Sequence, residues 1–172
     1  MLYSIKLGDV MNIFILDLDH KKCAEYSFNS YVVKLSLEAT QLLNNALIKH
    51  DESYDPVYRQ SHKNHPASLW ASESKDNFDW LTLLSLELCK EYTFRYGKRH
   101  VCQNIIEFFS FSSSRNKIPQ KGMTPFALCM PDKYKTTDAV NSYRLYVKNE
   151  KQHLAKWKNR PTPDWWEGTP II

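Results

Sequence analysis

Residues 30–50 limit the possible folds of this chain more than any other stretch, because they contain neither glycine nor proline. Their apolar residues recur every three or four positions, the spacing that gathers side chains on one side of an α-helix. This apolar stripe consists of Val32, Leu35, Ala39, Leu42 and Ala46. A second stripe on the same spacing is polar and consists of Tyr31, Lys34, Glu38, Gln41 and Asn45. The stretch predicts a long helix with one buried side and one side that needs a polar environment.

Helix start and stop signals divide the rest of the chain into further helices. Five residues mark the expected boundaries: Asp19, Asp76 and Asp138 as caps, Pro66 in a first turn and Gly97 as a terminator. The expected helices run over residues 20–28, 66–74, 77–98, 100–111 and 139–159. A short apolar run at residues 13–16 is expected to form a strand or an extended segment. We predict a mainly α fold, a single compact helical domain with that one short N-terminal strand or extended segment.

The composition fits one domain with a hydrophobic core, since 42% of the 172 residues are hydrophobic and 24% are charged. We interpret residues 1–10 as an N-terminal extension and residues 11–172 as the domain, with Met11 as an alternative start. No apolar run approaches the length that spans a membrane, and there is no signal-peptide pattern. The four cysteines are widely separated, which favours a reducing compartment over a disulfide scaffold. We expect a cytoplasmic monomer that does not bind membranes.

The sequence SHKNHP at residues 61–66 places two histidines three positions apart, directly before a proline. One interpretation is structural, with His65 capping the helix that follows. Another is a metal site. A third is a polar edge at which His62 and His65, aided by Lys63 and Asn64, bind phosphate or take part in catalysis. We favour the third interpretation.

A zinc site would need His62 and His65 together with His100 and Cys102 as a tetrahedral set. No Cys-x-x-Cys pair or acid pair accompanies these histidines, so we expect no metal. Glycine occurs only four times, and the chain has no Gly-rich loop of the Walker or dinucleotide-binding kind. We therefore expect no cofactor of any kind.

Two clusters of basic and aromatic residues favour nucleic-acid binding, which the net charge of +4 permits. The first cluster, in residues 92–100, includes Arg95, Tyr96, Lys98 and His100. The second, on the last expected helix, includes Arg144, Lys148 and Lys151. Cations neutralise phosphates while aromatic rings stack on bases. The alternatives are compensation of a helix dipole for the first cluster and a solvated helix face for the second.

Glu38 is the carboxylate that we select as catalytic. It follows Lys34 by one helical turn and Tyr31 by two, and these two residues are expected to bind nucleic acid beside it. The alternative is an exposed ion pair with Lys34, although lysine before glutamate is the weaker orientation. If the polar stripe faces a cleft, Glu38 donates a proton or stabilises a developing cation. We expect one concave, positively charged surface lined by Lys34, Glu38, His62, His65, Arg95 and His100.

Several segments together resemble a family of tailed-bacteriophage proteins whose function is not assigned. The resemblance spans residues 11–166 and is carried by MNIFILD, VVK, HKNHP, EYTFRYGKRH, NEK and AKWK. It implies a protein that acts in the cytoplasm of a bacterial host cell.

The layout is more remotely similar to the pyrimidine-dimer DNA glycosylases of phage, which are small all-α proteins. Those enzymes carry a catalytic glutamate on an early helix, seven residues after a histidine, and Glu38 follows Tyr31 by seven here. Tyr31 thus stands where the family has histidine. The family also uses its N-terminal amine as a nucleophile, whereas this chain has ten residues before Met11, followed by Asn12. The lyase half of that chemistry is the part that the resemblance supports least.

The resemblance implies a DNA-processing protein, a DNA N-glycosylase that acts on a damaged or modified base without a cofactor. Glu38, His65 and His62 would lie at the chemistry, with DNA as the partner. One alternative is a non-catalytic factor that binds nucleic acid or a host protein. Another is a small enzyme that acts on a nucleotide or nucleotide derivative.

Overall fold

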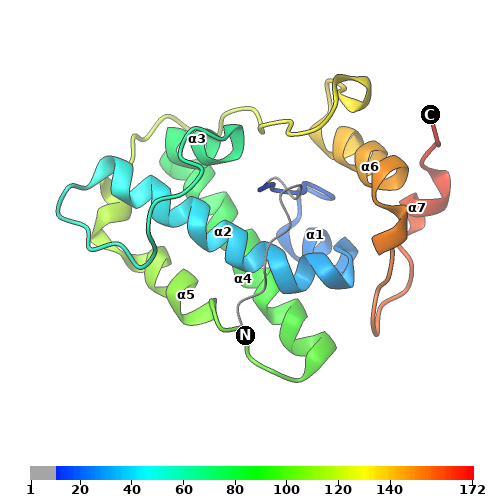
Figure 1. The fold of residues 1–172 in the computed structure, drawn as a ribbon, viewed down its shortest axis with the longest axis horizontal. Coiled ribbons are helices and arrows are strands. Elements are labelled where there is room, and N and C mark those ends of the chain that lie inside the picture. The colour runs from blue at the N-terminus through cyan, green and yellow to red at the C-terminus, as the bar shows by residue number, and fades with distance from the viewer. Residues whose placement is uncertain (1–10) are drawn as a thin grey trace.

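Two long helices, α2 (Asn29–His50) and α4 (Lys75–Tyr96), pack along each other at the centre of the fold (Figure 1). The computed structural model describes residues 11–172, and in that range it contains seven α-helices, three short 3-10 helices and no strand. The other helices are α1 (His20–Tyr26), α3 (Pro66–Glu73), α5 (Gln103–Phe111), α6 (Ala139–Glu150) and α7 (Asp164–Gly168). The predicted mainly α fold is confirmed. The predicted extension at residues 1–10 lies outside the described residues.

The apolar stripe predicted for residues 30–50 forms one side of α2 and is buried. Each of its five members is at most 6% exposed. Helix α3 packs against both long helices, α1 packs against α4, and α5 packs against α4 and α2. None of the described helices combines the length and the apolar character that crossing a lipid bilayer requires.

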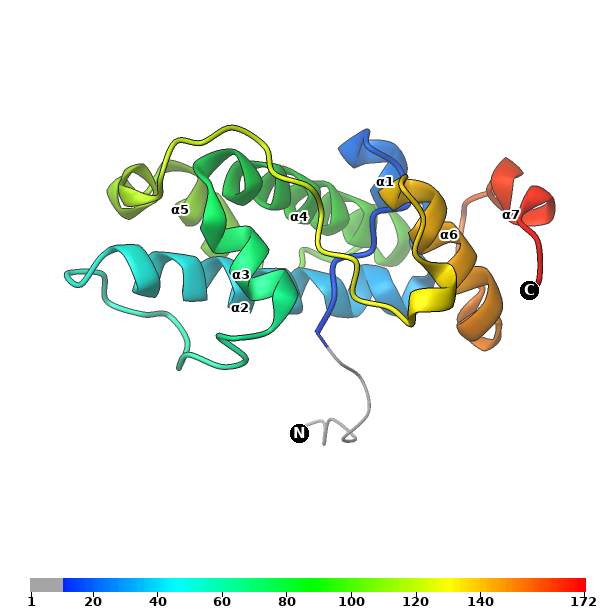
Figure 2. The ribbon, with the colours of Figure 1, turned by 90° about the horizontal axis from the view of Figure 1, so that it is seen from above.

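Residues 11–16 run through the core without regular secondary structure rather than as a strand in a sheet. The Phe14 ring stacks on Tyr31 of α2, with 4.3 Å between the ring centroids, and it also contacts Tyr143 and Tyr146 of α6. Figure 2 shows the segment passing between the long helices and α6. Because it fills the space between them, the segment joins α6 to the rest of the core.

Most predicted helix boundaries are confirmed, and one cap is wrong. The Asp19 side chain accepts a hydrogen bond from the backbone N–H of Lys22, and Gly97 ends α4 with a φ of 67°. The cap of α4 is Ser74, whose Oγ accepts a hydrogen bond from the backbone N–H of Asn77, and Asp76 lies within the first turn. The carboxylate of Asp76 still favours that helix end through the helix dipole.

The last long helix is shorter than predicted, because α6 ends at Glu150 rather than at residue 159. The following chain turns back towards α1 and the start of α2. There the Trp157 indole N–H donates to the Tyr26 carbonyl at 2.8 Å, and the Asn29 backbone N–H donates to the Lys156 carbonyl at 2.8 Å. These tertiary hydrogen bonds replace the backbone bonds that a continued helix would have made.

Candidate functional site

The first part of the polar stripe of α2, which consists of Tyr31, Lys34 and Glu38, lines a cavity of about 470 Å³, which we call the central pocket. The start of α3, the N-terminal segment, residues 128–131 and the end of α6 form its other walls. Five residues predicted as site residues line it: Tyr31, Lys34, Glu38, His65 and Lys151. Its apolar wall includes Phe14, Leu35, Leu128, Met130 and Tyr146. A cavity of this size, mostly apolar with a few polar groups, has the character of a small-ligand site.

Glu38 is buried at the pocket wall, with a side chain 10% exposed. The Asn12 backbone N–H donates to its Oε2 at 3.2 Å, and Lys34 Nζ lies 3.3 Å from its Oε1. The Lys34–Glu38 pair is therefore not the exposed ion pair of the alternative interpretation. A carboxylate held in this way presents a localised negative charge to whatever occupies the pocket.

His65 lines the pocket and also caps α3. Its Nδ1 accepts a hydrogen bond from the backbone N–H of Ala67 at 3.2 Å, so it caps α3 as the structural interpretation proposed. Partial burial lowers the pKa of His65, and the neighbouring His62 lowers it further. The ring therefore favours its neutral form, and because Nδ1 accepts, the proton of that form lies on Nε2. The predicted burial of Trp70 on α3 is confirmed, with 4% of its surface exposed.

The rest of the SHKNHP stretch is an exposed turn beside the pocket. His62, Lys63 and Asn64 are exposed and are not among the residues that line the central pocket. His62 has a positive φ of 52°, and its carbonyl accepts a hydrogen bond from the His65 backbone N–H. Of these two histidines, both expected on one concave surface, His65 lines the central pocket and His62 does not.

His100 lies in the interior rather than on the expected surface. Its Nε2 is 3.0 Å from the Val33 carbonyl, and its Nδ1 accepts from the Cys102 backbone N–H at 3.1 Å. Because both ring nitrogens contact the backbone, His100 is not placed to bind zinc together with His62 and His65. Among residues 11–172, no group of three or more His, Cys, Asp or Glu side chains is placed to hold a metal ion.

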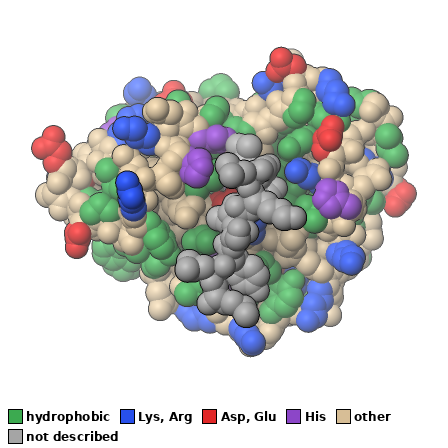
Figure 3. All heavy atoms as spheres, in the orientation of Figure 1, with side chains coloured by type: hydrophobic (Ala, Val, Ile, Leu, Met, Phe, Trp, Pro, Cys, Tyr) green, Lys and Arg blue, Asp and Glu red, His purple; other side chains and the backbone are tan. Residues whose placement is uncertain are grey.

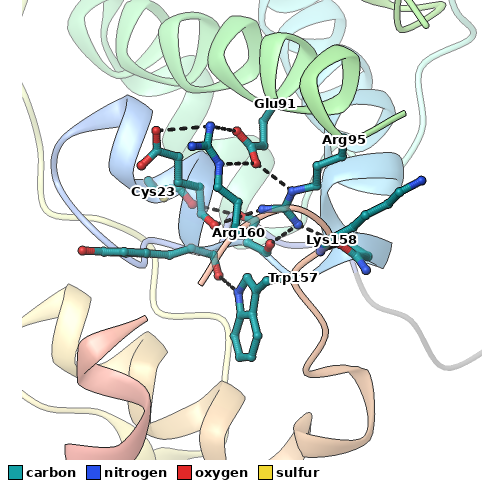
Figure 4. Close-up of polar contacts among 10 residues, drawn as sticks. Cys23, Glu91, Arg95, Trp157, Lys158 and Arg160 are labelled. Atoms are coloured by element: carbon teal, nitrogen blue, oxygen red, sulfur yellow. Dashed lines mark hydrogen bonds and ion pairs between the residues drawn. The ribbon is translucent and has the colours of Figure 1, made fainter. Parts of the chain in front are cut away.

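The prediction that Arg95 lies on an exposed basic surface is wrong, since only 2% of it is exposed. Its Nε donates to Glu91 at 2.7 Å, and its terminal nitrogens donate to the carbonyls of Ser27 and Glu25, both at 2.9 Å (Figure 4). Arg160 from the C-terminal tail bonds the other Glu91 oxygen at 2.8 Å. Arg95 therefore joins α4 to the end of α1 and is not available to a phosphate.

Two basic residues of α6 are likewise engaged inside the protein, against the prediction that they bind phosphate. Arg144 Nε donates to the Leu16 carbonyl at 2.9 Å, and Lys148 Nζ donates to the Trp166 carbonyl at 2.8 Å. Lys98 is exposed, and the Tyr96 ring packs against Tyr92. Neither Tyr96 nor Lys98 lines the central pocket.

The surface that remains basic is spread over the face drawn in Figure 3. On that face, Figure 3 shows Lys and Arg side chains of residues 11–172 scattered among Asp and Glu side chains, without a continuous basic patch.

The sequence interpretation missed Asn12 and Phe14, as well as the pocket wall at residues 128–131. For Asn12 and Phe14 the only signal was their place in MNIFILD, a segment that carries the resemblance. Helical periodicity gives no information on them, because Asn12 and the wall belong to segments without regular structure.

Comparisons of this chain with models of protein families, with curated proteins and with solved structures gave no match.

Proposed function

We propose that this protein is a DNA N-glycosylase that acts on a damaged or modified base. The observation that carries the proposal is the burial of Glu38 in the wall of the central pocket, with Lys34, His65 and Lys151 lining the same cavity. An enzyme that attacks a base must take the nucleotide out of the helix and hold it in a pocket. Phe14 and Tyr146 give this pocket an aromatic wall against which an extruded base would pack.

The chemistry that Glu38 supports is the hydrolysis of the bond between base and sugar. As that bond breaks, positive charge develops on the sugar, and a nearby carboxylate stabilises it or activates the attacking water. Lys34 and Lys151 neutralise the flanking phosphates. His65, neutral with its proton on Nε2, donates a hydrogen bond to a phosphate or sugar oxygen. No metal or organic cofactor takes part in this scheme.

Replacing His65 by asparagine is expected to lower turnover roughly 10- to 100-fold, which corresponds to one lost hydrogen bond to a charged group. Asparagine is a good N-cap, so α3 should keep its start and the melting temperature should change little. His65→Ala should also lose the cap, at a cost of about 0.5–2 kcal/mol. Turnover is measured on a duplex oligonucleotide that carries one thymine dimer. Wild-type turnover in both variants would show that His65 does not contribute to the reaction.

Replacing Lys151 by alanine is expected to flatten the dependence of DNA affinity on salt by about one phosphate contact. Lys151 lines the pocket, where a phosphate of the extruded nucleotide would lie. The control is Lys90→Ala, which removes the same charge from an exposed ion pair with Glu87. Fluorescence anisotropy at several salt concentrations gives both slopes. If the two slopes fall equally, the effect belongs to net charge and not to the pocket.

One observation favours the second function, an enzyme that acts on a free nucleotide. Arg95, Arg144 and Lys148 are engaged within the protein, so fewer cations remain for a long DNA contact than the sequence predicted. Binding of mononucleotides to the central pocket, without retention of duplex DNA at low ionic strength, would favour this function over the first.

A further inference from the structure

Asn12 lies at the junction of three parts of the fold beside Glu38. Its side-chain Nδ2 donates to the Cys129 carbonyl at 2.8 Å. Its Oδ1 accepts from the Ile13 backbone N–H at 2.8 Å and from the Tyr143 hydroxyl at 3.0 Å. A carbonyl on one side and N–H or O–H donors on the other fix the orientation of this amide. The side chain thus ties the N-terminal segment to α6 and to the wall at residues 128–131.

Tyr143 is the most deeply buried member of this cluster, with no exposed surface. Its hydroxyl lies 2.7 Å from the Ala127 carbonyl and accepts a hydrogen bond from the Cys129 backbone N–H at 3.3 Å. Burial raises the pKa of Tyr143 well above its usual value, so the hydroxyl keeps its proton at neutral pH. It therefore remains a donor to Asn12 or Ala127.

Asn12 also contacts Glu38 through its backbone. The Asn12 N–H donates to Glu38 Oε2 at 3.2 Å, and this peptide group is immobilised by the side-chain contacts of Asn12. A carboxylate that accepts from a fixed N–H group loses rotational freedom before any ligand arrives. Catalytic rates depend steeply on such placement, since an error of about 1 Å costs on the order of 100-fold.

We propose that Asn12 and Tyr143 are positioning residues for Glu38, acting through the Asn12 peptide group. The catalytic part of this inference, that the two residues serve turnover, rests on the proposed glycosylase function. The geometric part, that the Tyr143 hydroxyl holds the Asn12 N–H on Glu38, does not depend on the reaction.

The test uses Tyr143→Phe, which keeps the ring and removes only the hydroxyl. Tyr134→Phe is the matched control, because Tyr134 is 1% exposed, bonds Glu150 through its hydroxyl and does not line the central pocket. The first readout is the amide proton of Asn12 in the NMR spectrum of the full chain. Losing the hydrogen bond to residue 38 should move this resonance upfield in Glu38→Ala, which has no acceptor, and in Tyr143→Phe, but not in Tyr134→Phe. An unchanged Asn12 resonance in Tyr143→Phe would overturn the inference.

The second readout is turnover of the thymine-dimer duplex. Tyr143→Phe should lower kcat roughly 10- to 100-fold with KM unchanged, because Glu38 is misplaced while the pocket persists. Turnover at the wild-type kcat would reject the positioning role and leave the proposed function intact. If Tyr143→Phe moves the Asn12 resonance upfield while the wild-type protein releases no base, the proposed function is rejected and the geometric part remains intact. If Tyr143→Phe does not fold, Asn12→Ala replaces it with the same expected loss in kcat.

Discussion

Replacing Glu38 by glutamine is expected to lower turnover of a DNA substrate by roughly 100- to 10,000-fold while leaving DNA affinity unchanged. Glutamine has the shape of glutamate, and its amide oxygen can still accept the Asn12 N–H. It lacks the negative charge that stabilises the sugar cation and the basicity that activates water. Base release is measured in single-turnover reactions on the thymine-dimer duplex, and affinity by fluorescence anisotropy.

The control for this change is Glu87→Gln, which makes the same substitution in an ion pair with Lys90 on α4, away from the pocket lining. It should leave both turnover and affinity at wild-type levels. If Glu38→Gln retains full turnover, the carboxylate is not catalytic. If the wild-type protein binds the thymine-dimer duplex without any turnover, the result favours a binding factor, the non-catalytic alternative.

Replacing Arg95 by methionine is expected to lower the free energy of unfolding by roughly 3–5 kcal/mol, the range typical of a broken buried ion pair. The change leaves the carbonyls of Ser27 and Glu25 without their donor and removes one of the two arginines that bond Glu91. The matched control is Arg99→Met, since the Arg99 pair with Glu107 is exposed on both sides. Exposed pairs contribute about 0–1 kcal/mol, so the control should change stability little.

Urea denaturation of the two variants measures this difference. Equal and small losses would mean that Arg95 does not hold α4 to α1 as described. In conditions where the Arg95 variant is folded, its DNA affinity should show the wild-type dependence on salt, because the buried guanidinium makes no phosphate contact. A salt dependence flatter than that of the wild type would indicate that Arg95 contacts a phosphate.

The same network makes stability depend on pH. Burial on its own would raise the pKa of Glu91, but hydrogen bonds from Arg160 and Arg95 outweigh it and hold that pKa below its usual value. A carboxyl group with a lowered pKa stabilises the fold above its unfolded-state pKa of about 4.3, and this contribution is lost as pH falls through the folded-state value. Part of the stability of the wild type should therefore disappear in acid.

The sequence by itself determined the features that depend on near neighbours. The apolar stripe of α2, the Asp19 cap and the Gly97 terminator are each set within a turn or two of helix, so pattern and cap chemistry predicted them. The position of Glu38 at the wall of a pocket belongs to the same class, whereas its catalytic role stays a prediction. A polar stripe opposite an apolar one indicates a polar environment, and α2 turns that side towards the central pocket.

Tertiary structure alone decided which cations face solvent and what surrounds Glu38. Arg95 has the sequence context of a surface arginine at a helix end. In the fold it is buried and donates hydrogen bonds to carbonyls 68 and 70 positions away. The end of α6 depends on contacts of its tail with Tyr26 and Asn29, which no helix signal near residue 150 records. Asn12 meets Cys129 and Tyr143 across 117 and 131 positions. Local propensity carries no information about such pairings, because their free energy exists only when the distant segments are already packed together.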